Sequence, residues 1–171
     1  MQMVKKTFII LLIIWAALLV FMPKQEIYYQ LEKELAKNEI KINEKSIEEG
    51  WFSLTLNQVT VYAKGVKVAT VEKIDFFTVL FYSKIELRSF LLDDSLRSVA
   101  PSATEQAVLS HSLLSPRSIA VDANGSFGTI GGKIDLSERK IHIDFTEPKE
   151  IEMIREQLKK DEKGWYYERS F

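Results

Sequence analysis

Hydrophobic and polar residues change their spacing twice along this chain. An unbroken apolar run extends from Thr7 to Met22, and eleven of its sixteen residues are Phe, Ile, Leu or Val. From Ile27 to Leu35 the apolar residues recur at near-helical spacing among charged residues. From Glu39 onward the period becomes two, as in a strand with one buried face. The pattern predicts two N-terminal helices followed by a β-rich region.

The apolar run predicts a transmembrane helix over residues 7–23. At roughly −0.5 kcal/mol for each large apolar residue, insertion is favoured by about 5 kcal/mol. A helix of this length measures about 24 Å, and flanking lysines would compensate for a hydrocarbon core of about 30 Å. The residues expected to form the anchor are Phe8, Ile9, Ile10, Leu11, Leu12, Ile13, Ile14, Trp15, Leu18, Leu19, Val20 and Phe21.

A cleaved signal peptide and a buried core helix are the alternatives to an anchor. A signal peptide has the same basic start and apolar middle, but no A-x-A-like site follows the run. A core helix is rarely apolar on all faces. Lys5 and Lys6 precede the run, whereas Lys24 is soon balanced by Glu26. The positive-inside bias therefore predicts a cytoplasmic tail over residues 1–6 and an exported body. In a bacterium this is a single-pass inner-membrane protein with a periplasmic body.

Beyond a juxtamembrane helix at 24–38, residues 39–171 are expected to form one β-rich domain. Turn signals stand at Lys64-Gly65 and Asn124-Gly125, and a change of parity predicts a bulge near Asn57-Gln58. The segment 103–114 fits either a short helix or an edge strand. A helix is expected from Pro148 to about residue 160, and a final strand after Gly164. The predicted fold is mainly β, an antiparallel curved sheet or sandwich with one late helix and the N-terminal transmembrane helix.

Composition excludes several classes of function. The formal net charge is −1, with 23 basic and 24 acidic residues, and no basic block is present that would bind a nucleic acid. The chain has no cysteine, which excludes disulfides, thiolate nucleophiles and cysteine metal sites. No partner of the nucleic-acid class is therefore expected.

The sequence contains no recognisable catalytic constellation. His142 and Asp144 alternate with apolar residues, so they share the polar face of a strand, and a solvated outer face explains them better than a metal or acid–base site. His111 has no evident partner. The glycine-rich stretch 125–132 matches neither a dinucleotide fingerprint nor a P-loop. We therefore expect no enzyme activity, no cofactor and no metal.

Two stretches of the body resemble a known family. The first is GWFSLTL at 50–56 with the strands at 59–62 and 65–69. The second runs from ANGSFG at 123–128 through 132–141 to the closing GWYY at 164–167. Together they are similar to the type II secretion system protein N family (GspN) and, more distantly, to AsmA-like inner-membrane proteins. The resemblance implies one N-terminal anchor and a β-rich periplasmic body, and it carries over no catalytic residue.

Two functions follow from this resemblance and from the pattern. The first is an accessory component of a type II secretion-like machine that acts by contacts with other secretion proteins and is anchored in the lipid bilayer. The alternative is a module that handles lipid in an apolar groove, as AsmA-like and lipopolysaccharide-export proteins do. The residues expected to line such a groove, or to fill an ordinary core, are Phe52, Leu54, Leu56, Val79 and Phe81. The ordinary core is the more common fate of such residues, and an open half-pipe would favour lipid.

Overall fold

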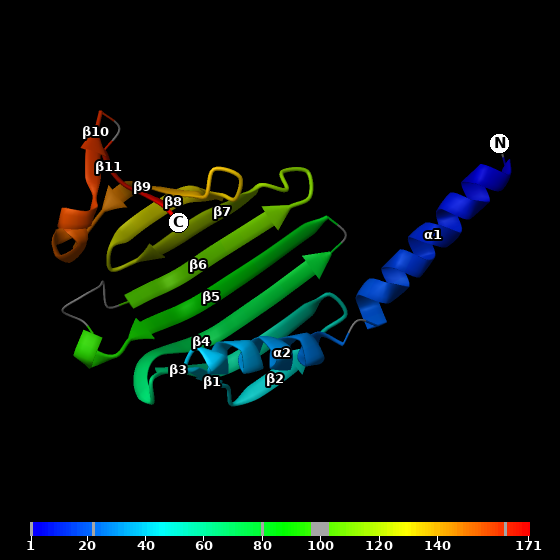
Figure 1. Ribbon diagram of the computed structural model, residues 1–171, viewed down its shortest axis with the longest axis horizontal. Helices are drawn as coiled ribbons and strands as arrows, with labels where there is room; N and C mark the ends of the chain where they lie inside the picture. The colour runs from blue at the N-terminus through cyan, green and yellow to red at the C-terminus, as the bar shows by residue number, and fades with distance from the viewer. Residues whose placement is uncertain (1, 22, 80, 97–102, 163) are drawn as a thin grey trace.

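The computed structural model describes residues 2–21, 23–79, 81–96, 103–162 and 164–171. Within these ranges the chain forms two α-helices and an eleven-stranded antiparallel sheet (Figure 1). The helices are α1 (Gln2–Phe21) and α2 (Lys24–Lys37), and short 3₁₀ helices span Asp94–Leu96 and Glu152–Gln157. The strands are β1 (Ile40–Asn43), β2 (Ser46–Glu49), β3 (Ser53–Ala63), β4 (Val66–Val79), β5 (Tyr82–Leu92), β6 (Ala103–Ser112), β7 (Ser118–Gly125), β8 (Gly128–Asp135), β9 (Lys140–Pro148), β10 (Lys159–Asp161) and β11 (Gly164–Ser170).

The sheet is a meander in which most strands pair with their neighbours in sequence. Its order is β1-β3-β4-β5-β6-β7-β8-β9-β11-β10, and β2 pairs with β3 beside β1. The first and last strands do not meet, so the sheet is open and curved (Figure 1). The prediction of a mainly β, antiparallel fold is confirmed, and the open curved sheet replaces the sandwich that the pattern also allowed.

Helix α1 projects away from the sheet (Figure 1). Among the described residues, no helix combines the length and the apolar character that crossing a bilayer requires. Because α1 begins at Gln2, it includes Lys5 and Lys6, and its uncharged apolar part from Phe8 to Phe21 is fourteen residues, or about 21 Å. The predicted single-pass inner-membrane location, with a cytoplasmic N-terminus and a periplasmic body, is therefore wrong.

The best-packed core lies where α2 contacts one end of the sheet. Tyr28 of α2 joins Leu54, Leu56, Val59 and Val71 in a single buried cluster. The helix carries an apolar stripe because its hydrophobic residues recur every three to four positions. The Tyr28 hydroxyl donates to Glu44 Oε2 at 2.7 Å, so its polar end is satisfied. Burial and this hydrogen bond raise the pKa of Tyr28.

A transverse bend crosses four neighbouring strands. Gln58, Glu72, Ser89 and Glu105 are omitted from the ladders of β3, β4, β5 and β6. Gln58 and Ser89 have φ of 49° and 52°, in the left-handed region. The apolar positions change parity here, but Gln58 and Glu72 are skipped together, so the pairing register does not change and the bulge predicted near Asn57-Gln58 is not found there; the register of β3 and β4 shifts between Val61 and Tyr62 instead. A register shift of this kind bends a strand and increases its twist.

Three local expectations are corrected. The turn predicted at Asn124-Gly125 lies at Ser126 and Phe127, because Gly125 still pairs with Gly128 in the β7–β8 ladder. A Cβ atom at Gly125 would clash with the carbonyl oxygen of Ala103, so the glycine permits a close strand contact. Residues 103–112 form a central strand, since β6 pairs with both β5 and β7. The late helix is reduced to one 3₁₀ segment of six residues, because β9 continues to Pro148. The turn at Lys64-Gly65 and the final strand after Gly164 are confirmed.

Candidate functional site: an apolar groove

One face of the sheet carries two continuous rows of apolar side chains. Residues directly opposite each other in an antiparallel ladder share a face. The first row joins Leu54, Phe76, Ile85, Leu109, Val121, Gly132, Ile143 and Tyr167, and the second joins Leu56, Ile74, Leu87, Ala107, Ala123, Ile130, Phe145 and Trp165. We call these two rows the apolar face. They cross eight strands without a charged residue.

The opposite face is polar and is held by ion pairs and hydrogen bonds. At its centre, Glu86 is 6% exposed and accepts hydrogen bonds from Lys84 Nζ at 2.6 Å, Arg88 Nε at 2.7 Å and Gln106 Nε2 at 2.9 Å. The hydrogen bonds from Lys84 and Arg88 lower the pKa of Glu86 to about 2. The polar face is therefore suited to contact with solvent. The apolar face is suited to packing against another layer or molecule.

At one end of the apolar face, α2 encloses a cavity of about 240 Å³. Its lining residues come from α2, from the start of β3 and from β4: Lys24, Ile27, Tyr28, Leu31, Phe52, Leu54, Phe76 and Thr78. Most of this lining is apolar, and Lys24 at its margin is 3.6 Å from Glu49 Oε1. We call this cavity and the apolar face beyond it the groove.

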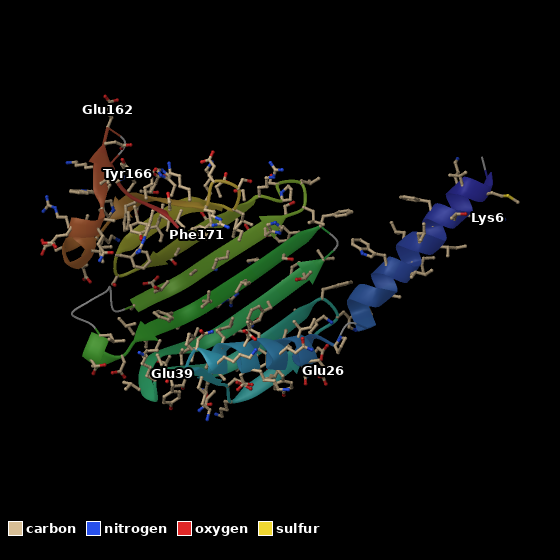
Figure 2. All side chains as sticks on the ribbon, in the orientation of Figure 1. Lys6, Glu26, Glu39, Glu162, Tyr166 and Phe171 are labelled. Atoms are coloured by element: carbon tan, nitrogen blue, oxygen red, sulfur yellow. The ribbon has the colours of Figure 1, made fainter. Side chains whose placement is uncertain are left out.

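Most of the groove is not covered by any described helix. Helix α2 packs mainly against β1, β2 and β3, and it crosses in front of that end only (Figure 1). No described helix or strand lies in front of β5 and β6 (Figure 2). Ile85, in the first row, is 37% exposed. An apolar sheet face normally packs against a second layer, and here that layer stops after a few strands.

The residues predicted for a groove or core fall in three places. Phe52 and Leu54 line the cavity, and Leu56 lies buried beside it at 1% exposure. Val79 ends β4 opposite Tyr82, outside the two rows. Phe81 lies in the β4–β5 loop, where its ring is 5.4 Å from that of Trp15.

The α2 side chains of the groove were not predicted from the sequence. Ile27, Tyr28 and Leu31 form one wall of the cavity. The signal that reveals them is the helical spacing of these residues, which predicts an amphipathic helix but not the surface it covers.

The predicted anchor residues lie along α1. Phe8, Ile9, Ile10, Leu11, Leu12, Ile13 and Ile14 are each more than half exposed. Trp15 is partly buried against Phe81. The backbone of the helix continues through Leu18, Leu19, Val20 and Phe21.

The histidines do not form a metal site in the part of the chain that the structure describes. His142 lies on the polar face, with Nε2 3.2 Å from Asp144 Oδ1 and Nδ1 3.3 Å from Glu168 Oε2. A hydrogen bond from Lys140 lowers the pKa of Glu168 to about 2. His111 lies 3.2 Å from the carbonyl oxygen of Pro116. These contacts are those of a charged outer surface.

Comparisons with known proteins identify no relative. No protein-family model matches the chain, and neither a curated protein nor a solved structure is significantly similar to it. The fold and the groove therefore define its class only as an open antiparallel sheet with one apolar face. The resemblance to the GspN and AsmA-like families stays a prediction.

Proposed function

We propose that this protein binds the acyl chains of lipids along the groove. The observation that supports the proposal is the apolar face, which is continuous over eight strands and covered by α2 at one end only. Seven inter-strand spacings of about 4.8 Å give the face a width of roughly 34 Å. An extended hydrocarbon chain is a suitable occupant, because it is apolar along its length and lies in a shallow trough without needing polar partners.

The open form of the sheet favours lipid over an ordinary core. Most of the described apolar residues that are buried belong to the cluster at α2, and those outside it are Ala69, Phe127 and Phe145. Between these places, apolar side chains such as Ile85 remain exposed. Large exposed apolar patches mark binding surfaces more often than stable monomer surfaces. Acyl chains would remove this surface from water at about 25 cal/mol for each Å² covered.

Photocrosslinking tests the proposal. p-Benzoylphenylalanine is placed in the full chain at Leu109, on the apolar face, or at Ser110, the next residue of β6 on the polar face. After irradiation with oleic acid, mass spectrometry is expected to show an oleate adduct on the Leu109 variant and little on the Ser110 variant. Equal adducts on both variants, or none on either, would contradict the proposal.

A second candidate function is an accessory role in secretion through protein contacts. The observation that favours it is the outer edge of β11. In the described residues β10 pairs with Gly164, Trp165 and Tyr166, and no strand pairs with the outer edge from Tyr167 onward. An unpaired edge accepts a strand from another protein. Recovery of secretion subunits with the native full chain, abolished by Glu168→Pro, tests this role. Recovery that is unaffected by the proline would exclude the edge.

A further inference from the structure

The loops at one end of the sheet carry exposed apolar side chains. Trp51 in the β2–β3 connection is 76% exposed, and Phe81 in the β4–β5 loop is 55% exposed. In the β6–β7 loop, Leu113 and Leu114 are 54% and 89% exposed, and Leu136 in the β8–β9 loop is 45% exposed. We call these five residues the apolar rim.

The meander places these residues on one rim. Connections in an antiparallel meander alternate between the two ends of the sheet. The links from β2 to β3, β4 to β5, β6 to β7 and β8 to β9 therefore all lie at the same end, which is the end from which α1 projects (Figure 1). The ring contact between Trp15 and Phe81 fixes α1 beside this rim.

Among the described residues, the loops at the other end carry no exposed large apolar side chain, since Leu96, Ile151, Ile154 and Leu158 are half-buried there. These loops include Lys64, Asp94, Glu150 and Glu162, and Figure 2 shows Glu162 at the far end of the sheet from α1. The one large apolar residue in the β7–β8 turn, Phe127, is only 9% exposed. Exposed apolar residues near that end, Val66 and Leu91, belong to strands. In the part of the chain that the structure describes, exposed apolar loop tips therefore belong to one end of the sheet.

Cationic side chains follow the apolar tips in two of the rim loops. Arg117 comes three residues after Leu114, and Arg139 three residues after Leu136, and both are exposed. Apolar and aromatic tips with arginines just behind them suit the boundary between acyl chains and anionic headgroups. A flat protein partner would instead require a continuous apolar patch on this surface, whereas the apolar residues here lie on four separate loops.

We propose that the apolar rim inserts shallowly into an anionic lipid surface. The tips enter the acyl boundary, the arginines meet the headgroups, and the contact is interfacial. Phe52 and Thr78, which line the cavity, lie next to the rim, so this docking turns the groove toward the lipid. The contact does not depend on acyl chains binding in the groove.

Single-cysteine labelling tests the rim. The chain has no cysteine, so Leu114→Cys, Leu136→Cys and Lys64→Cys each create one thiol in the full chain. Each variant carries an NBD fluorophore, whose emission rises in apolar surroundings, and is mixed with vesicles of phosphatidylcholine and phosphatidylglycerol. Lys64 lies in the β3–β4 turn at the opposite end and serves as the matched control.

We expect the emission to rise several-fold at positions 114 and 136 and to stay unchanged at 64. Attachment through α1 alone would leave both rim positions in water, so absence of a rise there would overturn the proposal. An equal rise at all three positions would overturn it as well. A rise without vesicles that grows with protein concentration would show that the rim packs against a second copy, and this too would overturn the proposal.

Discussion

At the scale of single residues, the polar face depends on one nearly buried carboxylate. Glu86 lies between Lys84 and Arg88 on its own strand and reaches Gln106 on β6. A charged group can be removed from water only where partners satisfy it. The three donors do so here, and the hydrogen bond from Gln106 joins β5 to β6 at the centre of the sheet.

Replacing Glu86→Gln is expected to lower the free energy of unfolding by about 2 kcal/mol at neutral pH, because hydrogen bonds to a charged acceptor are lost. The pKa of Glu86 is lowered on folding, so its contribution is complete above the ordinary value of about 4.5. It is lost as pH falls toward about 2. The difference between variant and wild type should therefore shrink across that interval in urea unfolding followed by circular dichroism.

Glu72→Gln provides the control for this substitution. Glu72 is an exposed glutamate at the transverse bend of β4, so its replacement should change stability little at any pH. A Glu86→Gln difference that stays constant from neutral pH to pH 2 would contradict the assigned role.

At the scale of elements, α2 decides which part of the apolar face is closed. Its apolar stripe is too short to cover eight strands, so it packs mainly on β1, β2 and β3 and leaves the others open. Tyr28 is the buried residue of α2 in this contact, at 4% exposure, and its hydroxyl donates a hydrogen bond to Glu44 in the loop between β1 and β2.

Tyr28→Phe is expected to lower the free energy of unfolding by about 1–2 kcal/mol, since it removes the hydrogen bond and keeps the ring. Chemical denaturation measures the loss. Tyr29→Phe, at an exposed neighbour on the same helix, is the control and should have less effect. Equal effects of the two substitutions would mean that the contact with Glu44 does not fasten α2.

At the scale of the whole molecule, the sheet is a single curved layer with different surfaces on its two sides and at its two ends. Proteins that bind an apolar ligand in the native state only are stabilised by it through mass action. The same open face that weakens the core therefore becomes a source of stability once it is occupied.

Oleic acid at about 100 times its dissociation constant should stabilise the native state by about 2.7 kcal/mol and raise the Tm. Leu109→Asp is expected to abolish the rise because it places a charge on the apolar face. Ser110→Asp, on the polar face of the same strand, should preserve it. Thermal unfolding of both variants with and without oleic acid provides the comparison, and a rise that survives Leu109→Asp would place the ligand elsewhere.

The sequence by itself determined most of the strands, their faces and the position of the bend. Alternation placed Leu54 and Leu56 on one face and His142 and Asp144 on the other, because side chains point to opposite sides at each step of a strand. The parity change at Gln58 marked the bend for the same reason, but the register shift of β3 lies at Val61 and Tyr62. The sequence did not locate the turn at Ser126. Gly125 is needed because β6 passes close to its backbone, and the local sequence does not indicate which strand will be its neighbour.

Only the tertiary structure decided whether the apolar face is covered. A buried face and an open groove have the same alternating pattern. Alternation shows which residues share a face of the strand, but it does not show whether another element covers that face. The position of α2 and the open order of the strands separate these cases. The rim is also a tertiary property, since Trp51, Phe81, Leu114 and Leu136 are far apart in sequence and the meander alone brings their loops to one end.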